Sequence, residues 1–106
     1  MLILSFCYQS ASAQHNAGNN GKILMIVSNP SVSKQTGWPI GVWYAEVTHP
    51  YWVFSEAGYN VDFASLDGGE IKFDGFSDPE DASKYAAFDY ISLGFKKDES
   101  KMAMLR

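Results

Sequence analysis

The chain has 106 residues, of which 46% are hydrophobic and 15% aromatic, so we expect one packed globular domain and no extended disorder. Eight basic and twelve acidic residues give a formal net charge of −4. This charge would repel a phosphate backbone, and the scattered lysines and arginines form no basic face, so we expect neither a nucleic-acid partner nor a membrane-surface helix.

The first thirteen residues have the composition of an export signal. An apolar run over 1–8 precedes small residues at 11–13, as signal-peptidase cleavage requires, although the usual basic start is missing. The alternative is an N-terminal tail from a misassigned start codon. We therefore predict a signal peptide over 1–13 and a Gly/Asn-rich linker over 14–21. The protein would then be exported, without a membrane anchor after processing, and otherwise cytoplasmic.

Cysteine and histidine are too scarce for a disulfide or a structural metal site. Cys7 is the only cysteine, so it has no partner within the chain and would be lost with the signal peptide. His15 and His49 are far apart, and no cysteine or carboxylate lies at metal-ligand spacing from either. We expect no metal, and the fold must depend on burial alone.

The first predicted strand follows the linker. Residues 22–28 form a continuous apolar run between turn-forming residues, which predicts a strand buried on both faces in a parallel sheet. The next stretch, 29–41, contains two prolines and two glycines and has no periodicity. We expect a long loop there, and such loops within compact domains often carry function.

A helix is expected over 42–56, with Gly58 as a left-handed residue at its end. Pro50 lies inside this helix and predicts a kink or break near 48–49, because proline removes one backbone donor and clashes with the preceding turn. We expect His49, which precedes this proline in an apolar setting, to be a packing residue and not a catalytic one.

The helix carries two adjacent stripes that we expect to be buried. Helical spacing defines their members as Trp43, Val47, Tyr51 and Phe54 on the first stripe, and Val42, Glu46, Pro50 and Val53 on the second. Phe63, from the next predicted strand, should join the aromatic members of the first stripe. We therefore predict one apolar cluster that contains Trp43, Tyr51, Phe54 and Phe63.

The sequence after the helix predicts a second strand and then helical segments. Residues 60–65 alternate in polarity and end in a glycine turn, so strand, helix and strand make one right-handed βαβ unit with a parallel pair. Residues 71–74 form a short extended piece, Pro79 suits the first position of a helix, and later helical segments are separated near Gly94. Two strands leave a sheet face and an edge uncovered, so we expect further strands after Arg106.

Glu46 is a carboxylate within an otherwise apolar helix. Burial of a carboxylate costs several kcal/mol unless the group is paired or protonated. A desolvated carboxyl group also holds its proton more readily, which would suit proton exchange with a nucleophile or substrate. The alternative is that Glu46 points to solvent or caps a backbone amide, and the helix pattern alone favours neither.

Four motifs in order resemble a known family. They are Thr-Gly at 36–37, Glu-x-x-x-Pro at 46–50, Ala-Gly at 57–58 and Ser-x-x-Gly-Gly at 65–69. Together they make residues 22–106 similar to the ThiJ/PfpI superfamily, also called type 1 glutamine-amidotransferase-like proteins, and in particular to its glyoxalase III and heat-shock chaperone branch. The resemblance implies an α/β fold, a flavodoxin-like parallel sheet sandwich, of which 22–106 would be the N-terminal half only.

The resemblance also implies a catalytic role for Glu46. In that family the matching glutamate hydrogen-bonds a cysteine thiol, and the thiolate attacks the aldehyde of methylglyoxal without a cofactor; chaperone and deglycase activities are also claimed. Glu46 would shuttle the proton, and a small aldehyde would be the substrate. Nothing in this sequence matches the family's cysteine and its neighbouring histidine, and Cys7 cannot replace them because it precedes the first strand.

Two functions from different classes are therefore open. One is the N-terminal part of a ThiJ/PfpI-type hydrolase or glyoxalase that is inactive alone, so whether this chain is an enzyme is undecided. The other is an exported, non-enzymatic binding or chaperone-like module that uses its uncovered apolar sheet face for interaction. The sequence does not decide the oligomeric state, and a homodimer is open to both.

Overall fold

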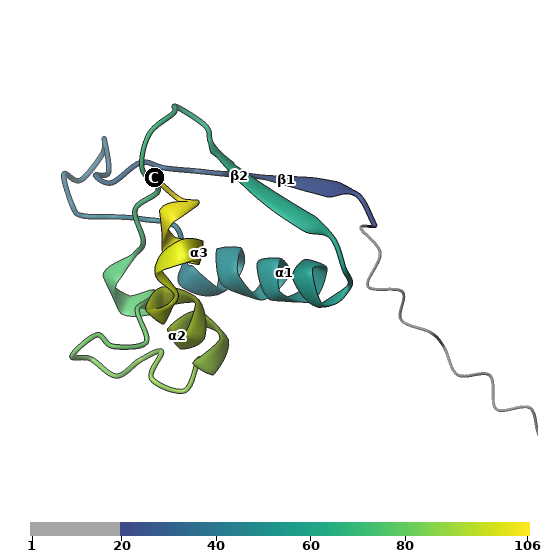
Figure 1. Ribbon diagram of the computed structural model, residues 1–106. Coiled ribbons are helices and arrows are strands. Elements are labelled where there is room, and N and C mark those ends of the chain that lie inside the picture. The colour runs from purple at the N-terminus through teal and green to yellow at the C-terminus, as the bar shows by residue number, and fades with distance from the viewer. Residues whose placement is uncertain (1–19) are drawn as a thin grey trace, which may run out of the picture.

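The computed structural model describes residues 20–106, which have a mixed α/β architecture (Figure 1). The predicted signal peptide over 1–13, with Cys7, and the linker up to residue 19 lie outside these residues. The elements in chain order are β1 (Lys22–Val27), α1 (Tyr44–Glu56), β2 (Asn60–Ser65), the 3-10 helix η1 (Gly75–Ser77), α2 (Tyr90–Lys97) and α3 (Glu99–Ala103). Within the described part of the chain, no helix has the length and apolar character needed to cross a membrane.

β1 and β2 form a two-stranded parallel sheet, as the sequence predicts, with Val27 aligned with Ser65 at its end. The helices lie on one side of this sheet (Figure 1). On the other side Leu24 and Ile26 are 59% and 68% exposed. Successive side chains of a strand point to opposite faces, so only the face that includes Val27 is covered. The prediction that the first strand is buried on both faces is therefore wrong.

A contact from a distant residue defines the start of α1, and a local turn defines its end. The Tyr44 amide donates to the Ser77 hydroxyl at 2.9 Å, so a side chain from η1 satisfies the start of the helix. Gly58 has a φ of 87°. The amides of Gly58 and Tyr59 donate back to carbonyls in the last turn, which is the pattern of a Schellman ending. The prediction for Gly58 is confirmed.

α1 continues through Pro50, so of the kink or break predicted near 48–49, the break is not formed. A proline removes one hydrogen bond from the helix and crowds the preceding turn. Here Val47 and Thr48 are buried just before it, and Tyr51 packs against the core just after it. Tertiary packing on both sides of Pro50 outweighs the loss of one backbone hydrogen bond.

The core lies between the covered sheet face, α1 and the C-terminal helices. Its buried members are Val27, Val42, Val47, Ile71, Phe95 and Leu105, and Tyr51, Phe63, Phe73 and Met102 pack against them. The Tyr51 ring centroid lies 5.8 Å from that of Phe63 and 5.1 Å from that of Phe95. Tyr51 and Phe63 therefore share one cluster, as predicted, whereas Trp43 and Phe54 are not among its members.

The extended piece predicted over 71–74 contributes one parallel bridge, in which Phe73 pairs with Val42. The Asp74 amide completes it by donating to the Val42 carbonyl at 2.9 Å. Gly41 permits this approach, because a Cβ at that position would lie only 2.3 Å from the Phe73 carbonyl carbon. The end of the long loop is thereby attached to the segment after β2.

The C-terminal helices begin later than the sequence predicts. Residues 79–88 contain only turns and bends, so no helix starts at Pro79. α2 starts after Asp89 and α3 after Asp98, and both aspartates cap the amides of the turn that follows them. Gly94 lies inside α2 and does not separate the helices. The carboxylate caps define these boundaries better than proline and glycine do.

Candidate functional site

Glu46 lies in the first turn of α1, and its side chain is exposed. Because the two strands are parallel, α1 runs back against them and starts at the end of the sheet where the strands finish (Figure 1). Of the two alternatives for Glu46, exposure to solvent is therefore the one observed. Val53 on the same stripe is 54% exposed, so the prediction that this whole stripe is buried is wrong.

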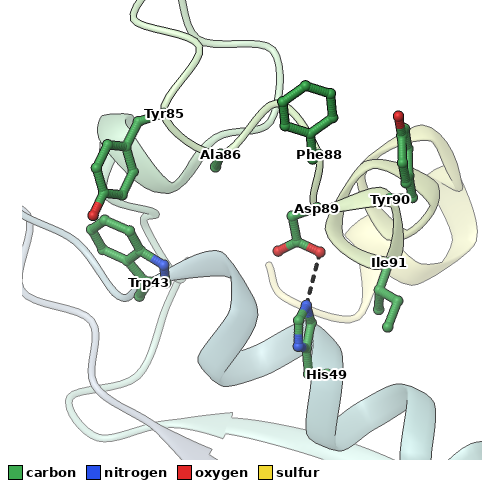
Figure 2. A pocket seen from close by; sticks show the side chains of 8 residues that line it. All are labelled: Trp43, His49, Tyr85, Ala86, Phe88, Asp89, Tyr90 and Ile91. Carbon is green, nitrogen blue, oxygen red and sulfur yellow. Dashed lines mark hydrogen bonds and ion pairs between the residues drawn. The ribbon is translucent and has the colours of Figure 1, made fainter.

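Two residues that line an open pocket lie three positions from Glu46 along the chain. Trp43 precedes Glu46 by three residues and His49 follows it by three, and such residues are neighbours on a helix surface. Trp43 and His49 line one side of a pocket of about 560 Å³, and residues between Tyr85 and Ile91 line the other (Figure 2). We call this hollow the aromatic pocket.

A histidine–aspartate pair lies inside the aromatic pocket. His49 Nε2 is 2.8 Å from Asp89 Oδ1, and the pair connects α1 to the residue that caps α2. Figure 2 shows the imidazole rising from the helix towards the carboxylate. The His49 side chain is 46% exposed. The prediction that His49 is an apolar packing residue is therefore wrong, because it is half-exposed and has a charged partner.

A chain of polar contacts continues from Asp89 into the interior. Asp89 Oδ1 accepts from the Ser92 amide at 3.1 Å, and Oδ2 accepts from the Ser92 hydroxyl at 2.5 Å. The Ser92 hydroxyl oxygen lies 2.7 Å from that of Thr48, which in turn contacts the Tyr44 carbonyl at 3.0 Å. Ser92 and Thr48 are completely buried. The interface between α1 and α2 thus contains hydroxyl groups whose partners lie within the protein.

The order of these groups limits their chemistry. In a serine-hydrolase triad the histidine lies between the serine and the carboxylate, so that it can accept the serine proton. Here Asp89 lies between His49 and Ser92, and Ser92 has no exposed surface. The arrangement positions the carboxylate and caps α2, but it does not activate Ser92 as a nucleophile.

The Asp89 carboxylate is held in its charged form. Burial is the largest influence and favours the neutral acid, but the hydrogen bonds from Ser92 and His49 together outweigh it and lower the pKa of Asp89. The side chain is 17% exposed. A negative charge therefore lies on the inner wall of the aromatic pocket at neutral pH.

A second ionic cluster attaches the 79–88 segment to α2. The Lys96 ammonium group lies 2.7 Å from both carboxylate oxygens of Asp78 and 3.0 Å from a carboxylate oxygen of Glu80. Lys97 adds a contact to Glu80. Two lysines on one helix thus bind two carboxylates at the start of this segment. These contacts hold the first residues of the segment against α2, and the turns that carry the pocket's aromatic residues follow from there.

The sequence pattern did not reveal the aromatic pocket, because 79–88 was expected to be helical and His49 to be buried. One local signal was present: Asp89 stands three residues before Ser92, a spacing typical of a helix cap. Its pairing with His49, 40 residues earlier, has no local signature. Among residues 20–106, no group of three or more histidine, cysteine or acidic side chains could hold a metal ion.

No family model matches the chain, and no curated protein or solved structure matches it at the significance threshold applied. The motifs of the sequence and the geometry of the described residues are therefore the features that bear on function.

Proposed function

We propose that this chain is the N-terminal part of a ThiJ/PfpI-type domain with a flavodoxin-like sheet, and that Glu46 is a carboxylate of its active site. The observation that carries the proposal is the exposed position of Glu46 in the first turn of α1. Open α/β sheets bind their ligands beyond the carboxyl ends of the strands, and α1 starts at that end. An accessible carboxylate there is available to a reacting group.

The proposed chemistry is the cofactor-independent conversion of methylglyoxal to lactate. A cysteine thiolate adds to the aldehyde carbon, a proton moves within the adduct, and hydrolysis releases lactate and the thiol. Glu46 would carry the moving proton, a role suited to a positioned carboxylate. None of the described residues is a cysteine, so the nucleophile must come from outside 20–106, and these residues should be inactive alone.

The uncovered side of the sheet supports the same proposal. Parallel sheets are normally covered on both faces, and two strands rarely suffice for a stable sheet. Leu24 and Ile26 are more than half exposed on the open face. Additional strands and a second helical layer would bury these side chains, and they would bring a strand-to-helix turn with a cysteine close to Glu46.

A fusion experiment tests this function. The present chain would be joined to the C-terminal half of a glyoxalase III-type domain that contains the cysteine, and lactate formation from methylglyoxal would be measured. We expect activity that falls about 10²-fold or more in Glu46→Gln, because general acid–base catalysis contributes at least that much. Glu56→Gln, at the exposed end of α1, should keep full activity. Equal activity in both variants would exclude a catalytic role for Glu46.

A non-enzymatic binding module is the second candidate, and the exposed aromatic residues of the aromatic pocket favour it. Tyr85, Phe88 and Tyr90 are 75%, 83% and 68% exposed. This candidate requires that the chain fold without further polypeptide. A cooperative thermal unfolding transition of the 106-residue chain would support it, whereas a molten state with dye-binding apolar surface would support the fragment of an enzyme.

A further inference from the structure

The mouth of the aromatic pocket is formed by aromatic rings from two parts of the chain. Trp43 and Tyr85 lie at one side, and Phe88 and Tyr90 stand above and opposite them (Figure 2). The planes of Trp43 and Tyr85 cross at 87° with their centroids 5.9 Å apart, which makes a corner of two rings. Four large aromatic residues gathered around one exposed hollow indicate a recognition surface more than a packing role.

The charge of the pocket is negative. Asp89 is ionised, and no lysine or arginine is among the lining residues. His49 Nε2 faces Asp89 Oδ1 at 2.8 Å. An anionic ligand would therefore be repelled.

The negative charge favours a cationic ligand, and the hydrogen bonds of Asp89 limit which kinds of cation could bind beside it. A carboxylate has about four acceptor sites, and the amide and hydroxyl of Ser92 and the ring of His49 already use three. The group offers charge but little capacity to accept further hydrogen bonds. The best fit is therefore a cation that donates no hydrogen bonds and has an apolar surface to pack against the aromatic walls. A metal ion or a primary amine fits less well.

We propose that the aromatic pocket binds an organic cation with a methylated ammonium head group. The faces of tryptophan, tyrosine and phenylalanine attract such groups within about 6 Å of the ring centroid. The Asp78–Lys96 and Glu80–Lys97 contacts hold the start of the 79–88 segment before a ligand arrives, which reduces the ordering cost of binding. This site is independent of the cysteine chemistry proposed for Glu46.

Choline is the probe, and 3,3-dimethyl-1-butanol, its neutral isostere, is the matched control. The full chain has three tryptophans, so the indole N–H signals of Trp38, Trp43 and Trp52 report separately by NMR. We expect choline to shift the Trp43 signal saturably, with a dissociation constant of about 1 mM, while the other two stay unchanged. The neutral isostere should bind at least about 10-fold more weakly, because it lacks the charge.

Variants test whether choline binds in the aromatic pocket. Backbone amide signals near Tyr85 or Phe88 are the readout common to all of them. Trp43→Leu and Asp89→Asn should each weaken choline binding by about 5- to 30-fold. Asparagine is also a good helix cap, so Asp89→Asn removes the charge and keeps the capping group. Trp38→Leu, at a 73% exposed position outside the pocket, should bind choline normally.

Three results would overturn the proposal. They are equal binding of choline and the neutral isostere, equal shifts of all three indole signals, and unchanged affinity in the variants of Trp43 and Asp89. If either variant loses its dispersed amide spectrum, Tyr85→Leu takes its place, because this side chain is 75% exposed and outside the core. A negative result here would leave the proposal for Glu46 standing, since the fusion assay does not use choline.

Discussion

The two sides of α1 are held by different chemistry. On one side, Val47 and Tyr51 belong to an apolar cluster with Phe63 of β2 and Phe95 of α2. Towards the cap of α2, Thr48 presents a buried hydroxyl to a chain of hydrogen bonds that ends at an aspartate. The stability of the apolar side depends on the buried surface area and tolerates small shifts of the side chains. The polar side depends on donor–acceptor distances of about 3 Å or less and on the presence of every hydrogen-bond partner.

The largest effect is expected on the apolar side. Phe95→Ala removes a ring that is 3% exposed and contacts both Tyr51 and Phe63. The lost contacts and the cavity should lower the free energy of unfolding by about 3–5 kcal/mol, measured by urea denaturation. Phe88→Ala is the matched control, because Phe88 is 83% exposed, and its effect should stay within about 0.5 kcal/mol. Similar losses in both variants would contradict the description of the core.

A smaller effect is expected on the polar side, and it should not be additive. Ser92→Ala leaves the Thr48 hydroxyl and one Asp89 oxygen without their buried partner, at a cost of about 1–3 kcal/mol. Replacing Thr48 with valine as well removes the second hydroxyl while keeping its shape. We expect the double variant to be no less stable than Ser92→Ala alone, as judged by a double-mutant cycle in urea. Simple addition of the two losses would show that the hydroxyls act separately.

The smallest effect is the pH dependence that Asp89 adds. Its pKa is lower in the folded protein than the ordinary value of 3.8. The folded state therefore binds this proton less readily than the unfolded state does, and the stabilisation is present above about pH 4 and lost as the pH falls through the lowered pKa.

Asp89→Asn cannot titrate, so it isolates this contribution. The stability difference between wild type and Asp89→Asn, from urea denaturation at pH 7, 4 and 3, should shrink towards the lowest pH. Asp62→Asn is the control, since Asp62 is 62% exposed on β2 and distant in sequence from the pair. A difference that is constant across these pH values would show that the carboxylate charge of Asp89 does not stabilise the fold.

The difference between local and long-range contacts explains what the sequence could predict. The strands, α1 and the role of Gly58 follow from local periodicity and from the conformational freedom of glycine, and the structure agrees with them. The helix start expected at Pro79 was a local inference too and is wrong, and the helix does not break at Pro50, because contacts from elsewhere in the chain decide those positions.

The candidate sites show the same limit. Periodicity alone could not decide whether Glu46 faces the core or solvent, because the helix carries two adjacent stripes and only tertiary packing selects the buried one. The pair of His49 and Asp89 is separated by 40 residues. No short-range pattern brings these two residues together, so the aromatic pocket could be recognised only in three dimensions.

The hydroxyl of Ser77 has a consequence for how the protein is made. It satisfies the first amide of α1 from a position 33 residues later in the chain. A helix of 13 residues with an internal proline is marginal in water on its own. During synthesis, α1 therefore emerges from the ribosome well before the residue that completes its first turn. We expect the helix to form late, once η1 has been released, so that α1 and the segments that contact it are assembled as one unit and not strand by strand.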